Sequence, residues 1–107
     1  KLLDAGIPVA VAPDFNPGSA PSYHLPLAMT LACLQQGMTP QEVLNGVTRV
    51  AARAVSADSR IGSIRPGYQA DLALIDAPDL NHWLYHFVPN ACAGVLKNGE
   101  WATQPSR

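Results

Sequence analysis

One carboxylate and three small polar or flexible residues lie within six positions of one another near the start of the chain. Asp14 comes first, and Asn16, Gly18 and Ser19 follow it. A carboxylate can bind a divalent cation, an amide and a hydroxyl can hydrogen-bond to a small polar molecule, and glycine lets a ligand approach the backbone closely. An aspartate at this point is also compatible with an ordinary turn. These four residues are the candidate site: a metal ligand followed by a small-molecule clamp.

The elements on either side would place this loop at an edge of a sheet. Residues 7–12 form a short apolar run rich in β-branched side chains, which predicts a parallel strand buried on both faces. The following residues, up to about position 24, are rich in Pro, Gly, Ser and Asn and are a loop by composition. In alternating α/β folds, active sites are built at the carboxyl ends of the strands. Asp14 is at such an end.

Two helices are expected after the loop. Residues 25–36 are apolar almost all round, which predicts a well-buried helix closed by Gly37. Thr39, Pro40 and Glu42 form the signature of a capping box, and apolar residues then recur at helical spacing to about position 55.

The second half of the chain has a strand pattern. Residues 61–67 and 70–75 predict two strands around a Pro-Gly turn, and residues 76–93 predict loop and short strands. Asn98-Gly99, between the apolar runs 93–96 and 100–102, is a strong hairpin signal. The chain therefore divides at about residue 57, and its second half has too few long apolar residues to form a core alone.

The start of the chain has the pattern of a helix end. Leu2 and Leu3 followed by Gly6 are typical of a last helical turn and its glycine stop, and no Met precedes them. We therefore expect a fragment of a longer protein.

Composition excludes several classes of protein. The chain has 107 residues, of which 48% are hydrophobic and 14% charged, and a net charge of -1 with scattered basic residues. This argues against disorder, and against nucleic acid or an anionic membrane as the main partner. No apolar stretch approaches the ~20 residues of a membrane span, and no signal-peptide pattern is present. Cys33 and Cys92 lack metal-site spacing, so both are expected to be buried thiols in a reducing cytoplasm.

The remaining polar and aromatic residues are expected to be structural or solvated. His82 and His86 are four apart, but Pro78 and Pro89 bracket them and no Glu follows His82, so metal ligation is not expected. Asp71 is expected to hold the turn after Gly67. His24 is not expected to be a ligand. Arg49 and Arg53 are expected to be solvated or paired locally, and Trp83, Tyr85 and Trp101 to pack.

Four segments resemble the amidohydrolase superfamily. IPVAVAPDFNPGSAPSYHLPLAMTLAC resembles the eighth-strand segment of one branch, in which DFNPG or DCNPG follows the last barrel strand. MTPQEVLNGVTRVAARAV is similar to a helix found across the superfamily, and IGSIRPGYQADLALID and VLKNGEW resemble strands of its small β domain. The likeness covers nearly the whole chain, but only DFNPGS is specific to the one branch. Pro13 departs from the Thr or Ser that is usual there.

The resemblance implies a fold and a reaction. Residues 1–57 would be the end of a (β/α)8 barrel, with its last strand, active-site loop and two helices, and residues 58–107 the C-terminal strands of a small composite β-sandwich domain. Asp14 would bind the single divalent metal, zinc or iron, and take part in proton transfer from the attacking water. Asn16 and Gly18 would contact the product and Ser19 the ring substrate. The reaction implied is hydrolysis of the cyclic amide of 4-imidazolone-5-propanoate to N-formimidoyl-L-glutamate in histidine degradation.

The resemblance also bears on activity, assembly and location, and two alternatives stay open. A catalytic zinc site needs about three protein ligands, and the chain has no His-x-His motif, so the isolated chain is expected to be inactive. The remainder of the barrel would be its partner, a homodimer is a possible assembly, and the location would be cytoplasmic. The alternatives are a fragment of another amidohydrolase, such as a nucleobase-deaminase-like enzyme, and a non-catalytic remnant that folds without metal.

Overall fold

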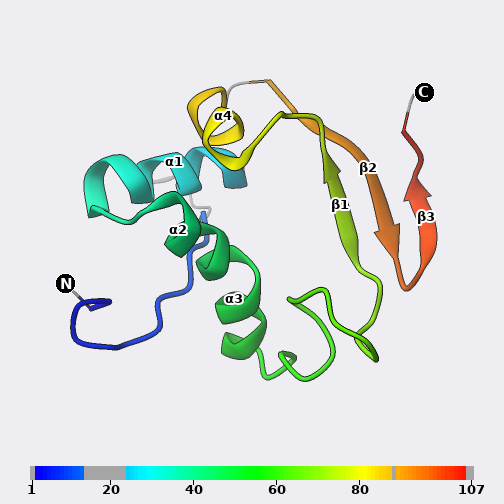
Figure 1. Ribbon diagram of the computed structural model, residues 1–107, viewed down its shortest axis with the longest axis horizontal. Coiled ribbons are helices and arrows are strands. Elements are labelled where there is room, and N and C mark those ends of the chain that lie inside the picture. The colour runs from blue at the N-terminus through cyan, green and yellow to red at the C-terminus, as the bar shows by residue number, and fades with distance from the viewer. Residues whose placement is uncertain (1, 14–23, 88, 106–107) are drawn as a thin grey trace.

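The computed structural model of the chain describes residues 2–13, 24–87 and 89–105. The helices gather on one side of the molecule and a small sheet on the other (Figure 1). The helices are α1 (Leu25–Gln36), α2 (Pro40–Val47), α3 (Arg49–Ala54) and α4 (Leu80–Tyr85). The strands β1 (Leu72–Ile75), β2 (Cys92–Lys97) and β3 (Glu100–Thr103) form an antiparallel sheet in the order β1-β2-β3.

Local sequence signals set the ends of the first two helices. Gly37 closes α1 in the left-handed region at φ 73°, and its N–H donates to the Ala32 carbonyl, as the sequence predicted. The predicted capping box of α2 is confirmed. Thr39 Oγ1 accepts from the Glu42 N–H at 3.2 Å, and Glu42 Oε1 accepts from the Thr39 N–H at 2.9 Å.

The helix predicted to run to about residue 55 is interrupted at Thr48. This residue has φ -115° and ψ -89°, outside the helical region, and separates α2 from α3. Its hydroxyl donates to the Leu44 carbonyl at 2.7 Å. Such back-bonding gives the backbone an alternative to the helical ladder and often bends a helix. The single long helix was therefore wrong, although both halves are helical.

The core lies where α1, α2 and α4 meet. Met29 and Val43 are fully buried, and Leu84 of α4 packs with them. The buried Thr30 hydroxyl donates to the Leu84 carbonyl at 2.7 Å, which ties α1 to α4. The prediction of loop and short strands for residues 76–93 was wrong where α4 forms, at Leu80–Tyr85. The N-cap of α4 is Asp79, whose Oδ1 accepts from the His82 N–H at 2.7 Å.

Residues 7–13 do not form the predicted strand within the described part of the chain. They are extended, with Val9 and Val11 half-buried and Ile7 and Ala10 exposed. The Val11 N–H donates to the Gly46 carbonyl of α2 at 3.0 Å. A strand needs a neighbouring strand to pair with, and here the segment packs on a helix instead. The prediction of burial on both faces was therefore wrong for this structure.

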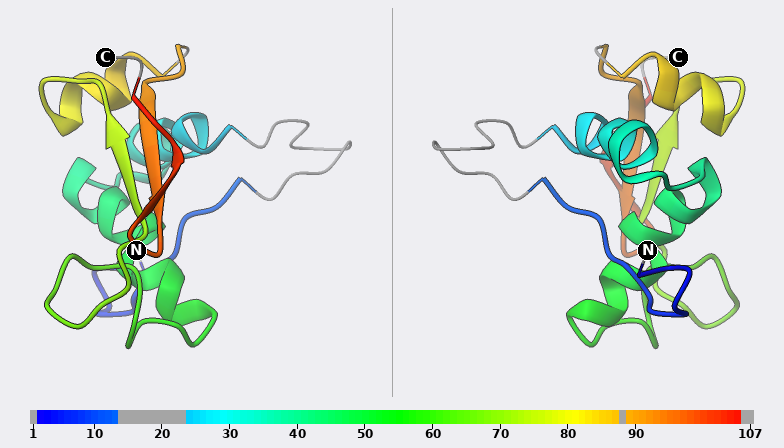
Figure 2. Two further views of the ribbon diagram at one scale, coloured as in Figure 1. Left: turned by 90° about the vertical axis from the view of Figure 1, so that its right-hand side faces the viewer. Right: turned by 90° about the vertical axis from the view of Figure 1, so that its left-hand side faces the viewer.

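The contact with α2 depends on Gly46. A Cβ at this position would lie 2.9 Å from Val11 Cγ2 and 2.9 Å from the Val9 carbonyl oxygen. These separations are shorter than real Cβ contacts, so a side chain at residue 46 would push the extended segment off the helix. Figure 2 shows that the end of residues 7–13 and the start of α1 lie on the same side of the molecule.

The sheet confirms part of the strand pattern. The hairpin of β2 and β3 turns at Asn98 and Gly99, with φ 52° and 81°, and Lys97 pairs with Glu100. A two-residue turn of this kind needs positive φ at both residues, which Asn and Gly adopt readily, and this is why Asn-Gly predicts a hairpin. Strand β1 confirms the prediction for residues 70–75. Residues 61–65 do not form the predicted short strand, and Gly62 lies at φ 90°, whereas Pro66-Gly67 forms the predicted turn, with Gly67 at φ 86°.

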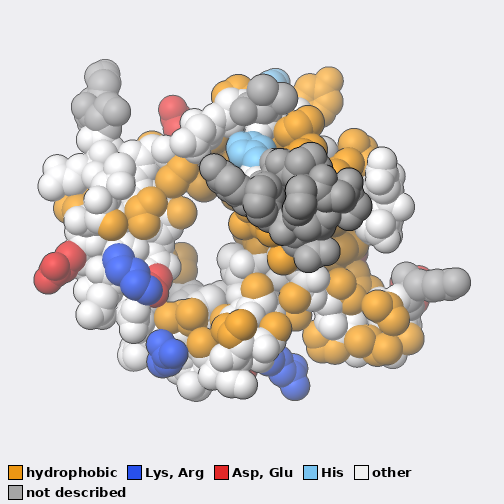
Figure 3. All heavy atoms as spheres, turned by 180° about the vertical axis from the view of Figure 1, so that it is seen from behind, with side chains coloured by type: hydrophobic (Ala, Val, Ile, Leu, Met, Phe, Trp, Pro, Cys, Tyr) orange, Lys and Arg blue, Asp and Glu red, His pale blue; other side chains and the backbone are white. Residues whose placement is uncertain are grey.

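Several large hydrophobic side chains remain on the surface. Leu34 is 77% exposed, Ile64 86% and Trp101 44%. Figure 3 shows hydrophobic side chains gathered on the back of the molecule. No helix in the described part of the chain has both the length and the apolar character to cross a membrane.

Gly46→Ala tests the contact between the extended segment and α2. Alanine favours a helix over glycine by roughly 1 kcal/mol, so helix propensity alone would stabilise the variant. The overlap with Val9 and Val11 instead predicts a net loss of about 1–2 kcal/mol, measured by urea unfolding followed by circular dichroism. Asn45→Ala, next to it on α2, is the matched control and should be close to neutral. A Gly46→Ala variant as stable as the parent would contradict the contact.

Candidate functional site

The candidate site residues Asp14, Asn16, Gly18 and Ser19 lie outside the described residues. The structure describes the two flanks of their loop. On the upstream side, Pro13 is half-buried, and the Val11 backbone is fixed to Gly46 of α2. The chain that leads into the loop is therefore held on a helix that belongs to the core.

The downstream flank is held by His24. It is the N-cap residue of α1, and its Nε2–H donates to the Phe87 carbonyl at 2.6 Å. Phe87 follows α4, so this bond joins two segments that are 63 residues apart in sequence. The half-buried imidazole therefore braces the start of α1 against the segment that follows α4.

His82 and His86 lie on α4 with their rings stacked. The ring centroids are 4.1 Å apart and the planes differ by 23°. His86 Nδ1–H donates back to the His82 carbonyl at 3.0 Å, so this nitrogen is engaged with its own helix. Tyr85 contacts the His86 ring edge-on at 5.0 Å but is 81% exposed, which corrects the prediction that it packs inside. Trp83 does pack on the core, as predicted.

The described residues do not assemble a metal site by themselves. Among residues 2–13, 24–87 and 89–105, no group of three or more His, Cys, Asp or Glu side chains is placed to hold an ion. A catalytic zinc site takes about three protein ligands.

Asp71 is structural, but it holds a different turn from the predicted one. Its Oδ2 accepts from Lys97 Nζ and its Oδ1 from the Asn98 N–H, both at 2.8 Å, and Gln69 Nε2 donates to both oxygens. The carboxylate therefore fixes the β2–β3 hairpin rather than the turn after Gly67. Hydrogen bonds from Lys97, Gln69 and Asn98, in that order, lower the Asp71 pKa from 3.8 to about 2.

The two cysteines differ in environment. Cys33 on α1 is half-buried against the core, and burial raises the pKa of its thiol. Cys92 at the start of β2 is exposed, so the prediction of two buried thiols was wrong for Cys92.

A family model for amidohydrolases matches residues 1–102. The chain belongs to the amidohydrolase family. An imidazolonepropionase of Geobacillus sp. (strain WCH70) is 47% identical over all 107 residues, which are 25% of that protein. An imidazolonepropionase of Treponema denticola is 41% identical over 107 residues, 26% of its length. The chain thus spans about a quarter of the length of the curated amidohydrolases it matches.

A solved structure agrees with the family. A crystal structure of an amidohydrolase superposes on 69% of this chain with a TM-score of 0.58 and 22% sequence identity, and the match covers 18% of that protein. The matched 69% of this amidohydrolase chain therefore has a fold that a solved amidohydrolase also contains.

Asp71→Asn tests the carboxylate that holds the hairpin. Because the folded-state pKa lies below the ordinary value, the ionised form stabilises the fold above about pH 4, and this contribution is lost as pH falls through about 2. The variant should therefore unfold at lower urea concentration than the parent amidohydrolase chain at pH 7. The difference between the urea midpoints of the variant and the parent should narrow as pH falls from 4 to 2. Asp76→Asn, at an exposed carboxylate just after β1, is the control, and an Asp71→Asn gap that does not change with pH would refute the account.

Proposed function

We propose that this chain supplies one metal ligand and the substrate-binding loop of an imidazolonepropionase. That enzyme would hydrolyse the cyclic amide of 4-imidazolone-5-propanoate to N-formimidoyl-L-glutamate in histidine degradation. The observation that carries the proposal is the 41–47% identity to imidazolonepropionases over the full length of the chain. The DFNPGS sequence, which resembles the metal-ligand loop of this branch, supports it.

The proposal places residues 1–57 at the end of a (β/α)8 barrel and residues 58–107 in a small composite β domain. The extended segment 7–13 supports the barrel part. Val9 and Val11 are half-buried and lie next to Gly46 of α2, while Pro8, Ala10 and Ala12, which alternate with them, are exposed. A barrel strand likewise has one face against the surrounding helices and the other toward the interior. Neighbouring strands from the rest of the barrel would pair with this segment and complete the predicted strand.

Asp14 is proposed as the one metal ligand that this chain contributes. Amidohydrolases are in general metal-dependent, and a carboxylate oxygen suits zinc or iron. The sequence has no His-x-His motif, so the other ligands would come from outside this chain. When bound, such an ion polarises a carbonyl and lowers the pKa of a bound water. Asn16 and Gly18 would contact the open-chain product, and Ser19 the ring substrate.

The loop flanks support this assignment of roles. One flank is fixed by the contact of Val11 with Gly46 and the other by the bond from His24 to Phe87. A loop held at both ends by packed elements can present polar groups to a ligand with little loss of conformational entropy. The isolated chain would still lack the remaining ligands, so we propose that it is inactive alone.

A fusion protein tests the proposal. The C-terminal quarter of the Geobacillus imidazolonepropionase is replaced by this chain, and ring opening of 4-imidazolone-5-propanoate is measured together with metal content. We expect the fusion to bind about one divalent ion and open the ring, and the chain alone to do neither. In the fusion, Asp14→Ala should lower kcat/KM by more than about 100-fold, which exceeds the usual cost of losing a residue that only orients a metal ligand.

The controls separate a lost ligand from a lost fold. Asp76→Asn, at an exposed carboxylate, should leave metal content and kcat/KM unchanged. A fusion that folds, contains metal and does not open the ring would sink the substrate assignment. An Asp14→Ala fusion with full metal content and full activity would sink the ligand assignment.

A further inference from the structure

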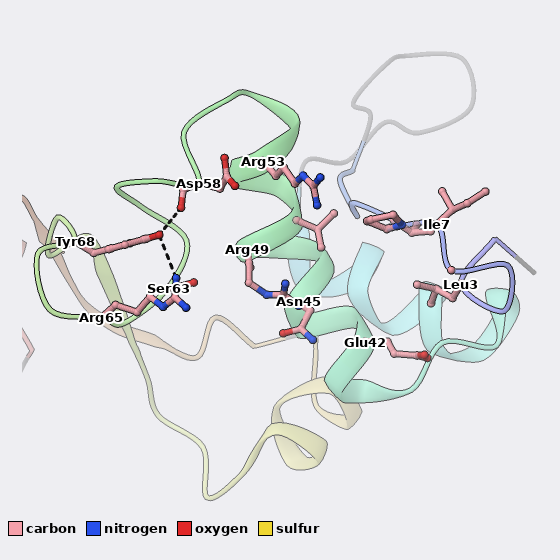
Figure 4. Close-up of a pocket in the computed structure, with 14 residues that line it drawn as sticks. Leu3, Ile7, Glu42, Asn45, Arg49, Arg53, Asp58, Ser63, Arg65 and Tyr68 are labelled. Carbon is pink, nitrogen blue, oxygen red and sulfur yellow. Dashed lines mark hydrogen bonds between the residues drawn. The ribbon is translucent and has the colours of Figure 1, made fainter.

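A groove of about 490 Å³ lies where three separate segments of the chain meet. The α2–α3 region forms its floor, the N-terminal segment around Leu3 and Ile7 forms one wall, and the loop that carries Arg65 and Tyr68 forms the other (Figure 4). This volume is within the usual range for small-molecule sites. The groove is at the upstream end of the extended segment 7–13, whereas Asp14 follows the downstream end.

Positive charge is concentrated in this groove. The chain has seven basic residues, and Arg49, Arg53 and Arg65 all line the groove. Arg49 and Arg53 are one helical turn apart on α3, so their side chains emerge from the same face. The ion pair recorded within the described part of the chain joins Lys97 to Asp71. No such pair there neutralises the three guanidinium groups.

The carboxylates of the lining do not cancel this charge. Glu42 and Asp58 also line the groove, so three guanidinium groups face two carboxylates. Glu42 is engaged in the capping box of α2, where its Oε1 accepts from the Thr39 N–H. The lining therefore has a net positive charge, although the chain as a whole has a net charge of -1.

The opposite wall is polar and braced. The Tyr68 hydroxyl donates to the Asp58 carbonyl at 2.7 Å and accepts from Arg65 Nη1 at 3.4 Å, as the dashed lines in Figure 4 show. The Arg65 guanidinium also lies 5.6 Å from the centre of the Tyr68 ring. These contacts restrict Arg65, so less side-chain entropy is lost when it binds an anion. The N-terminal wall is apolar, with Leu3, Ile7 and Val9.

We propose that this groove binds a small organic anion. A carboxylate or phosphate group lies between the guanidinium groups of Arg49 and Arg53, with Arg65 beside them, and the apolar body of the ligand lies against Leu3 and Ile7. Guanidinium groups match the planar, two-oxygen geometry of both anions. The site uses only residues of this chain that the structure describes, and it does not rest on the proposed hydrolase function.

Binding to the 107-residue chain is measured by isothermal titration calorimetry with inorganic phosphate, phenyl phosphate and phenylacetate. We expect phenyl phosphate to bind more tightly than inorganic phosphate because its ring covers the apolar wall. Comparison of phenyl phosphate with phenylacetate shows which anionic group the site prefers. Binding of each probe should weaken as NaCl is raised, since the attraction is between charges in a groove open to solvent.

Variants separate a built site from general charge attraction. Arg49→Gln combined with Arg53→Gln should weaken phenyl phosphate binding by about tenfold or more. Arg53→Lys keeps the charge, so its affinity for phenyl phosphate should fall less than that of the double variant. Arg60→Gln removes a charge outside the groove and should leave the affinity within about twofold. Circular dichroism confirms that each variant retains the helices. No binding of any probe by the parent chain, or an equal loss for Arg60→Gln and the double variant, overturns the proposal.

Discussion

The close approach of an extended backbone to a helix at Gly46 is the constraint on which the rest of this structure depends. The Val11 N–H reaches the Gly46 carbonyl because residue 46 has no Cβ to separate them. The same helix contributes Val43 to the core and begins at the capping box of Thr39. One glycine thus connects the segment that leads to Asp14 with the best-packed part of the chain. The hydrogen bond to its carbonyl and the absence of a side chain together set the course of the segment.

A second set of contacts holds the other end of the candidate loop. His24 and Thr30, at the start and middle of α1, donate to carbonyls at Phe87 and Leu84. These bonds join residues that are 63 and 54 positions apart in sequence, and they couple α1 to α4 and the residue that follows it. Packed and capped helices therefore border a loop that carries the proposed chemistry, the usual arrangement by which a rigid scaffold positions functional residues. The relatives are about four times as long as this chain, and the proposed barrel would use their additional length to complete the site.

The features that the sequence predicted well are those decided by a few neighbouring residues. Gly37, the Thr39 capping box and the Asn98-Gly99 turn each depend on local dihedral angles and hydrogen bonds, and all three are found. Strands depend on partners far away in sequence, which explains why residues 7–12 and 61–65 were predicted as strands and are not. Helix α4 was missed because its six residues have little periodicity, although Asp79 was a usable cap signal. Residue types and spacing made Asp14 the candidate ligand, but they could not place it, because the other ligands of the proposed site would belong to other strands.

The most direct test of the central claim is an anomalous difference map from crystals of the fusion between this chain and the Geobacillus enzyme. Data collected at the zinc and iron absorption edges would locate the ion and identify it. The account predicts one peak at about 2.0–2.2 Å from an Asp14 carboxylate oxygen. A metal peak with no contact to Asp14, or an Asp14 carboxylate hydrogen-bonded within its own turn and facing away from the ion, would contradict it.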